Sequence, residues 1–163
     1  MSPTKPQAKE QNCSLKGVFQ PTQIDIYIDG GARGNPGPAG TGVVILDDKG
    51  QKIDEFKEYI GHATNNTAEY RALISGLQLA KKYIPCSINV FTDSELIYRQ
   101  MTGSYKVKNE NLKEYFITAH QMLSSFEKVD FKHVPREQNK LADKLVNQAI
   151  NIGSTLETGL KER

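Results

Sequence analysis

The segment from Ile24 to Gly37 constrains the fold most, because a strand pattern gives way there to a glycine-rich pattern. Residues 24–29 alternate between isoleucine and Asp25, Tyr27 or Asp29, as expected of a half-buried β-strand. Four glycines follow within residues 30–37, and glycine lets neighbouring backbone approach a ligand closely. Asp29 is therefore expected on a rigid strand end beside a permissive loop. Since Asp-Gly is also a common hairpin dipeptide, an ordinary turn is the alternative interpretation.

The rest of the chain predicts a single α/β domain. Short links between the first three strands indicate an antiparallel meander, and the later strand–helix crossovers predict a mixed, five-stranded sheet flanked by helices. The first strand should lie near the centre of the sheet, parallel to the fourth and fifth. The expected strands are 24–29, 42–46, 53–60, 87–91 and 129–134, and the expected helices are 67–83 (capped by Asn66), 95–101, 112–126 and 139–150.

The composition fits one domain between two polar ends. Residues 1–22 predict a flexible leader, residues 23–152 the folded domain and residues 153–163 a polar tail. With 21 basic and 19 acidic residues, the net charge of +2 neither requires nor excludes a nucleic-acid partner. No apolar run is long enough to cross a bilayer, no secretory signal is evident, and Cys13 and Cys86 lack metal-type spacing. We therefore expect a cytoplasmic monomer with no membrane contact and no obligate protein partner.

Four carboxylates stand at the ends of the expected elements: Asp29, Glu69, Asp93 and Asp143. Sites in open sheets collect at the carboxyl ends of parallel strands, where Asp29 and Asp93 fall. Each carboxylate also has a structural interpretation. Glu69 fits a capping box with Asn66. Asp93 fits a cap for the helix that follows it, and Asp143 fits a favourable contact with a helix dipole. These interpretations are independent of each other, so they do not explain why all four should converge.

A cluster of carboxylates predicts bound cations, because like charges repel strongly unless cations hold them. Oxygen ligands without cysteine suit Mg²⁺ or Mn²⁺, and two such ions about 3.5–4 Å apart support in-line phosphodiester displacement. His133, at the end of the fifth strand, could move protons near such ions at neutral pH. The alternative is an ordinary surface histidine.

Four segments carry a family resemblance: Tyr27–Pro38, Thr64–Tyr70, Phe91–Ser94 and His133–Asp143. In this order and at these element ends they resemble type I ribonuclease H, in the handle-less form of bacteria and archaea, over about residues 23–150. The resemblance implies a ribonuclease H-like fold. It also implies an endonuclease that cleaves the RNA strand of RNA–DNA hybrids and leaves 3′-hydroxyl and 5′-phosphate ends.

The resemblance implies roles for single residues as well. The four carboxylates match residues that bind two Mg²⁺ ions, with Mn²⁺ as a substitute. Asp29 would bridge both ions, Asp143 would share the ion that activates water, and Glu69 and Asp93 would help hold the second. His133 matches a histidine that assists proton transfer or product release. Substrate contacts are implied for Gly30, Asn35, Thr64, Asn65, Asn66 and Ser94, of which Asn35 and Thr64 resemble residues that seat a phosphate of the DNA strand.

The chain departs from some relatives at two places. Where His62 stands, some relatives carry arginine, so the DNA-strand phosphate should be gripped less firmly. Some relatives also insert a basic handle where this chain has only residues 103–109. We therefore expect modest affinity for the hybrid, with Lys106 and Lys108 as weak substitutes for the handle.

Two other functions stay open at this point. A non-catalytic nucleic-acid-binding module would be favoured by the loss of a carboxylate, and none is missing. Another nuclease or transposase of the wider superfamily would act on DNA. Asn35 and Asn66 near the site favour RNA instead, because an amide can both donate to and accept from a ribose 2′-hydroxyl.

Overall fold

The computed structural model describes residues 20–161, so the first 19 residues of the predicted leader lie outside the described part of the chain. Five strands form one sheet in the order β3-β2-β1-β4-β5. β1 pairs antiparallel with β2 and β2 with β3, whereas β1 pairs parallel with β4 and β4 with β5. The predicted meander, the mixed sheet and the central first strand are thus confirmed. The strands are β1 (Gln23–Ala32), β2 (Gly37–Leu46), β3 (Lys52–Ala63), β4 (Ser87–Thr92) and β5 (Lys128–His133).

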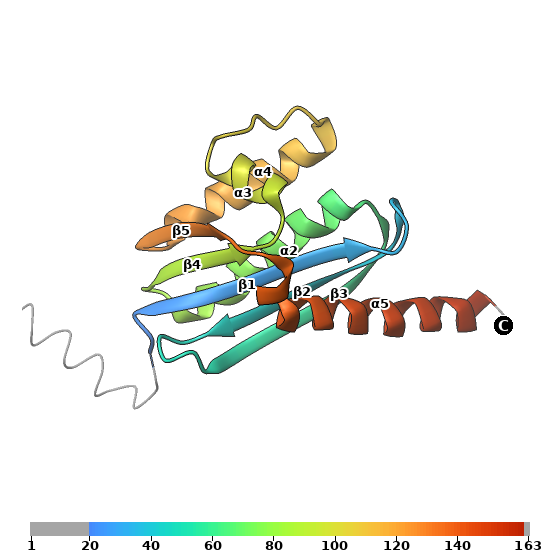
Figure 1. The fold of residues 1–163 in the computed structure, drawn as a ribbon, viewed down its shortest axis with the longest axis horizontal. Helices are drawn as coiled ribbons and strands as arrows, with labels where there is room; N and C mark the ends of the chain where they lie inside the picture. Colours follow the sequence, from blue (N-terminus) through green and yellow to red (C-terminus); the bar gives the residue numbers. More distant parts are fainter. Residues whose placement is uncertain (1–19, 162–163) are drawn as a thin grey trace, which may run out of the picture.

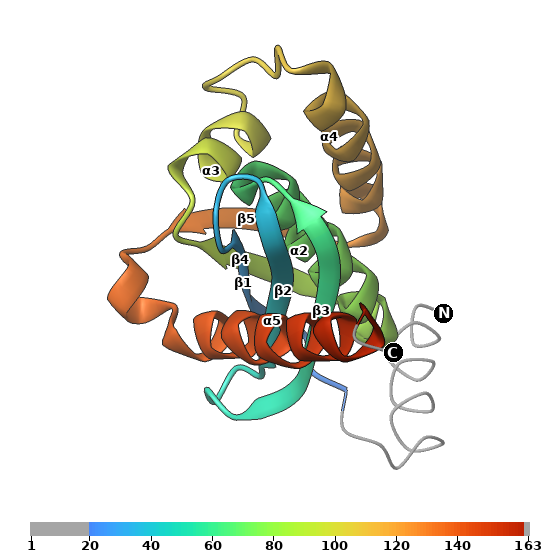
Figure 2. The ribbon, with the colours of Figure 1, turned by 90° about the vertical axis from the view of Figure 1, so that its right-hand side faces the viewer.

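Helices cover both faces of the sheet (Figures 1 and 2). One face carries α2 with α4 packed against it, and the opposite face carries α5, which crosses β1, β2 and β3. Residues 102–109 alone join α3 to α4. The helices are α2 (Asn65–Ala80), α3 (Glu95–Met101), α4 (Glu110–Met122) and α5 (Lys140–Lys161), with 3-10 turns at Lys81–Tyr83, Leu123–Ser125 and Arg136–Gln138. Among the helices of residues 20–161, none combines the length and the hydropathy needed to span a bilayer.

The hydrophobic core fills the space between the sheet and α2. Ile24, Ile26 and Ile28 are 0–1% exposed and pack with α2 residues such as Leu73 and Leu77, as the alternation in β1 predicts. Burying each such side chain stabilises the fold by roughly 1.5–3 kcal/mol. A second apolar layer lies under α5 and contains Ala142, Leu145, Val146, Ala149 and Ile150.

The start of α2 differs from the expectation. Thr64, not Asn66, is the N-cap, because its hydroxyl accepts a hydrogen bond from the Thr67 amide at 3.2 Å. Asn66 lies inside the first turn. The capping-box interpretation of Glu69 is therefore wrong, and the carboxylate of Glu69 instead accepts a hydrogen bond from the Gly30 amide at 3.3 Å.

The end of the last helix was also predicted wrongly. α5 does not stop at Ile150 but continues through Gly153 to Lys161, across most of the expected polar tail. Gly153 is buried under Tyr59, where an added Cβ would lie 2.0 Å from the ring. The hydroxyl of Tyr59 donates to Glu157 at 2.8 Å. Gly153 therefore permits a close helix–sheet contact rather than ending the helix.

Candidate active site

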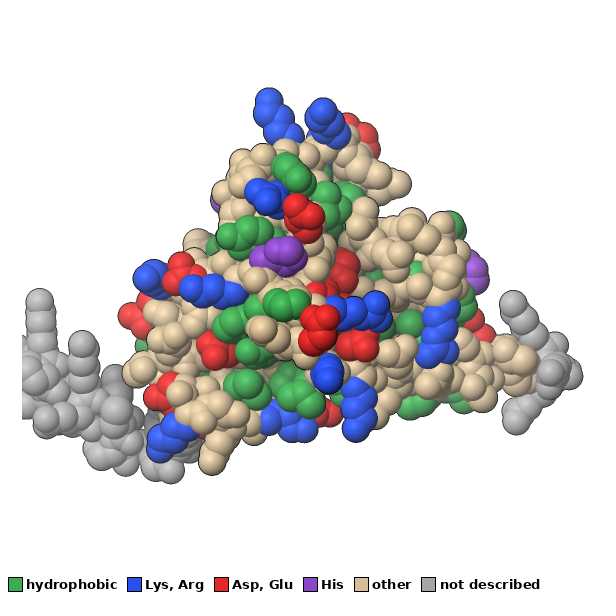
Figure 3. Space-filling view, viewed as in Figure 1, with side chains coloured by type: hydrophobic (Ala, Val, Ile, Leu, Met, Phe, Trp, Pro, Cys, Tyr) green, Lys and Arg blue, Asp and Glu red, His purple; other side chains and the backbone are tan. Residues whose placement is uncertain are grey.

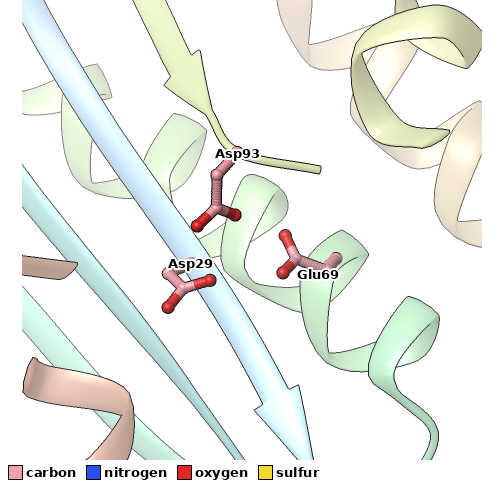
Figure 4. Close-up of side chains that lie close together, drawn as sticks. All are labelled: Asp29, Glu69 and Asp93. Atoms are coloured by element: carbon pink, nitrogen blue, oxygen red, sulfur yellow. The ribbon is translucent and has the colours of Figure 1, made fainter. Parts of the chain in front are cut away.

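Three of the four predicted carboxylates form a compact group. Asp29 is a buried residue of β1, which continues to Ala32 and so ends three residues later than expected. Glu69 lies on the second turn of α2, and Asp93 directly follows β4. One ligand oxygen from each lies within 4.8 Å of the other two (Figure 4). Segments far apart in the sequence thus deliver three oxygen ligands to one point at the carboxyl ends of two parallel strands.

Asp143 approaches this group from α5. It lines the same cavity as the other three carboxylates, and its charge contributes to the raised pKa of Asp29. Asp143 is half-buried, and its Oδ1 lies 3.5 Å from a guanidinium nitrogen of Arg136. The structure therefore brings all four predicted carboxylates to one cavity, where the charge of Asp143 acts on both Asp29 and Asp93.

Two glycines bring the helices to Asp29. A Cβ on Gly30 would lie 2.2 Å from the Ala68 carbonyl group, and a Cβ on Gly42 would lie 2.3 Å from the Ala142 oxygen. Gly30 directly follows Asp29 in β1, and Gly42 is the residue of β2 that pairs with Asp29. Since Glu69 follows Ala68 and Asp143 follows Ala142, each close helix–strand contact places the next carboxylate beside Asp29.

Asn139 fastens the start of α5 to β1, a role that the sequence analysis missed. Its side-chain amide donates to the Ile28 carbonyl at 2.8 Å, directly before Asp29, and the residue is 1% exposed. A buried polar side chain normally has such a partner. Its position before a helix gave no signal that its partner would be a strand 111 residues away.

Burial raises the pKa of three of the carboxyls. Burial, followed by the charges of Asp93 and Asp143, raises the pKa of Asp29 to about 8. Burial and the charge of Asp29 raise the pKa of Glu69 well above its usual range. Burial also raises the pKa of Asp93, although a hydrogen bond from Asn139 opposes the rise. The group is therefore poorly suited to carry its full negative charge unless a cation compensates it.

The residues present fit a divalent cation. Oε2 of Glu69 is buried and has no hydrogen-bond partner among the described residues, an arrangement that is costly unless something else binds the oxygen. The ligand atoms are all carboxylate oxygens, the type that Mg²⁺ and Mn²⁺ prefer. Asp29, Glu69, Asp93 and Asp143 are the side chains that would hold the cation.

The cavity around the carboxylates measures about 570 Å³. Gly30, Asn65, Asn66 and Ser94, four of the predicted substrate-binding residues, line it. Ser94 also caps α3, where its hydroxyl accepts from the Ile97 amide at 3.2 Å. Three further polar residues that the sequence analysis did not assign to the site also line the cavity, namely Arg33, Arg136 and Asn147.

Asn35 and Thr64 lie outside that cavity. The side-chain oxygen of Asn35 accepts from the Asn65 amide at 3.0 Å, and the side-chain oxygen of Asn65 accepts from the Ala32 amide at 2.9 Å. Asn35 thus supports the Asn65 backbone. Thr64 lines a second cavity of about 720 Å³, together with His62 and residues from the start of α4.

His133 lies at the end of β5 and is exposed. Its ring stacks on Tyr98 with 5.6 Å between the centroids, and it is not among the residues that line the carboxylate cavity. The structure therefore places His133 at the exposed end of the strand that leads to α5, outside the lining of the carboxylate cavity.

Comparison with known proteins identifies the family. Residues 27–149 match a family model described as reverse transcriptase-like. A Mycobacterium tuberculosis protein described as bifunctional is 43% identical over 133 residues, which are 81% of this chain but 36% of that protein. The chain thus spans about a third of this relative. The solved ribonuclease H domain of that protein matches with a TM-score of 0.80 at 40% identity, covering 83% of this chain and 99% of the domain.

Two further relatives match over most of their own length. Ribonuclease HI of Halobacterium salinarum is 37% identical over 140 residues, which cover 84% of this chain and 70% of the relative. The structure of LC11 ribonuclease H1 in complex with an RNA/DNA hybrid matches at 50% identity, with a TM-score of 0.76 and coverage of 80% of this chain and 98% of that chain. By sequence, by fold and by the carboxylates that this fold gathers, the chain belongs to the ribonuclease H family.

Proposed function

We propose that this protein is an endonuclease that cleaves the RNA strand of RNA–DNA hybrids with divalent cations held by Asp29, Glu69, Asp93 and Asp143. The observation that carries the proposal is the convergence of these carboxylates, with the buried, unpartnered Oε2 of Glu69, in one cavity. The relatives named ribonuclease H support it, and one of them is solved with an RNA/DNA hybrid.

The proposed site holds two Mg²⁺ ions, with Mn²⁺ as a substitute. Bound Mg²⁺ lowers the pKa of a water molecule and stabilises the charge that develops on the phosphate. Asp29 would contribute to the binding of both ions, a role supported by its place within 4.8 Å of ligand oxygens of Glu69 and Asp93 and by the action of the Asp143 charge on it. Glu69 is held by the Gly30 amide, which leaves its other oxygen free for a cation.

The amides beside the carboxylates are proposed to select RNA. Asn65 and Asn66 are exposed in the first turn of α2 and line the cavity. A side-chain amide offers both donors and an acceptor, so it can bind a 2′-hydroxyl that DNA lacks. Asn35 would act indirectly, because its side-chain oxygen accepts a hydrogen bond from the Asn65 backbone amide and so helps to position Asn65.

His133 is proposed to carry a proton to or from the reaction. Because it stacks on Tyr98 at the exposed end of β5, it would act at the rim of the site and not as a ligand. Replacing His133 with alanine should lower kcat by about 10²-fold or more if proton transfer limits turnover. An unchanged kcat over the full pH range would remove His133 from the mechanism.

The function is tested by cleavage of a hybrid labelled on either strand, beside matched duplex RNA, duplex DNA and single-stranded RNA. We expect cleavage of the hybrid's RNA strand alone, with 5′-phosphate ends, only when Mg²⁺ or Mn²⁺ is present. Cleavage of the DNA strand would favour the alternative of a DNA-directed nuclease. Binding without cleavage in either metal would favour a non-catalytic module.

We also propose that the active form is a monomer. Size-exclusion chromatography combined with light scattering, on the same sample that is assayed, would test this. Activity that requires a dimer would contradict it.

A further inference from the structure

The cavity continues past the carboxylates along α5. Its walls there are Val146, Asn147 and Ile150 of α5 and Ala32 and Arg33 at the end of β1. None of these residues belongs to the carboxylate group. A strand lying across the carboxylates therefore has room to continue over this part of the molecule.

Two amides of α5 hold the guanidinium of Arg33. One of its nitrogens donates to the side-chain oxygen of Asn151 at 2.6 Å, and the other donates to that of Asn147 at 3.3 Å. The amide nitrogen of Asn147 donates in turn to the Asp143 carbonyl at 3.1 Å. Since Asn147 and Asn151 lie one helical turn apart, both face the same side of α5 and fix one orientation of the arginine.

These partners are neutral, so they orient the charge of Arg33 without compensating it. Within residues 20–161, no carboxylate lies within 4.0 Å of this guanidinium, whereas Arg71, Arg99 and Arg136 each pair with one. Figure 3 shows basic side chains gathered beside acidic ones over the start of α5. An exposed, oriented guanidinium with unused N–H donors is well suited to a phosphate.

We propose that Arg33 binds a backbone phosphate of the cleaved strand, beside the phosphate at the carboxylates, and that Asn147 and Asn151 position it for this contact. The inference rests on the proposed function, because it assigns the strand in the cavity to the RNA of a hybrid. The competing interpretation is a structural clamp between the β1–β2 turn and α5, which predicts an effect on stability but none on substrate binding.

The test compares KM, kcat and their salt dependence for the wild type, Arg33→Ala, Arg33→Lys and Lys57→Ala. Lys57 is the matched control, because its Nζ donates to the side-chain oxygen of Gln148 on α5 at 3.1 Å but does not line the cavity. Arg33→Ala should raise KM by about 10-fold or more with kcat nearly unchanged. It should also reduce the slope of log KM against log salt by about 0.7–0.9, the value for one phosphate contact.

Arg33→Lys should keep the salt slope, because the charge remains, and should recover part of the affinity. Lys57→Ala should change neither KM nor its salt slope. Thermal unfolding of each variant separates the two interpretations. A lowered melting temperature with an unchanged KM and salt slope would show that Arg33 is only a clamp.

Hybrids in which either the RNA or the DNA strand is shortened stepwise show which strand Arg33 contacts. The penalty of Arg33→Ala should disappear once the RNA strand no longer carries the contacted phosphate. Disappearance on shortening the DNA strand instead would overturn the assignment. A wild type that cleaves no hybrid would refute the proposed function. A wild type that cleaves while Arg33→Ala keeps its KM and salt slope would refute only the role of Arg33.

Discussion

Asp29 is the residue at which the demands of folding and of chemistry conflict most. It is 6% exposed and faces three other carboxylates, and its pKa of about 8 leaves it largely protonated at neutral pH in the absence of cations. A cation reverses the balance, because it favours the ionised form of every carboxylate around it. The same group therefore lowers the stability of the metal-free protein and provides the central ligand of the proposed site.

Replacing Asp29 with asparagine should separate these two effects. The amide keeps the shape but loses the charge, so we expect kcat on the hybrid to fall by about 10³-fold or more. In chelator the melting temperature should rise, because the amide has no proton to take up when the chain folds. The rise should be on the order of 2–4 °C for each kcal/mol gained. Hybrid cleavage and thermal unfolding in chelator measure the two changes.

Asp25→Asn is the control for this substitution. Asp25 lies on the same face of β1 and accepts a hydrogen bond from the Asn89 side chain at 3.0 Å, which an amide oxygen can also accept. Both the rate and the melting temperature should stay near the wild-type values. A near-normal rate for Asp29→Asn would contradict its assignment as a metal ligand.

At the scale of the elements, the site depends on how closely α2 and α5 approach the strands. Gly30, next to Asp29 in the chain, permits the approach of α2 on one face of the sheet. Gly42, which pairs with Asp29, permits the approach of α5 on the other face. A side chain at either position would displace a helix backbone, which cannot move aside as the end of a flexible side chain can. The geometry of the carboxylates is therefore a consequence of two helix–strand contacts.

Gly30→Ala tests this dependence, with Gly31→Ala as its neighbour and control. The added Cβ would lie 2.2 Å from the Ala68 backbone in the first variant but 3.7 Å from a Val146 methyl, an ordinary contact, in the second. We expect Gly30→Ala to destabilise the fold by about 1–3 kcal/mol and to lower the affinity for Mg²⁺. Gly31→Ala should leave the stability within about 0.5 kcal/mol. Urea unfolding and calorimetric titration with Mg²⁺ measure both, and equal stabilities for the two variants would disprove the explanation.

Sequence periodicity predicted the order of the strands and helices but not all of their limits. β2 begins at Gly37, five residues before the expected start, because glycines that indicate a loop are accommodated where α5 lies close to the strand. Gly153 suggested a helix end but lies under Tyr59. Thr64 and Asn66 are both good N-caps, so local sequence could not choose between them. Tertiary contacts decided each of these cases.

The site shows the same division between local and tertiary information. The four carboxylates could be found from the sequence because each falls near the end of an expected element, although β1 continues three residues past Asp29, to Ala32. Arg33, Asn139 and Asn147 could not be found in this way, because their hydrogen-bond partners across the fold lie 111 to 118 residues away. These pairs become visible only when α5 is placed against β1. Local patterns reveal which residues end an element, but they do not reveal which elements meet.

For the molecule as a whole, the carboxylate group should control how stability depends on pH. Below about pH 4 the carboxyls are protonated in both the folded and the unfolded chain. Between that value and the pKa of Asp29, about 8, the folded protein retains a proton that the unfolded chain has lost. In chelator, stability should therefore fall as the pH rises, by up to about 1.4 kcal/mol per pH unit for one proton. Glu69, whose pKa is also raised, acts in the same direction.

Asp54, a carboxyl outside the site, should act in the opposite direction. Burial raises the pKa of Asp54, but hydrogen bonds from Lys82, Glu55 and Tyr83 outweigh it and lower the pKa overall. A lowered pKa contributes stability that is lost only in acid, as the pH falls through the folded value. A decline in stability from mildly acidic to mildly alkaline pH would therefore point to the carboxylate group and not to the surface ion pairs.

Adding Mg²⁺ should cancel this decline, because a ligand that binds only the folded, ionised site stabilises it by mass action. Urea unfolding across the pH range, with chelator and with Mg²⁺, measures both curves. Asp29→Asn should flatten the chelator curve and weaken the response to Mg²⁺. Stability that rises with pH in chelator, or that Mg²⁺ leaves unchanged, would mean that the four carboxylates do not form a cation site. The ribonuclease H fold would remain in that case, but the proposed cleavage chemistry would lose its physical basis.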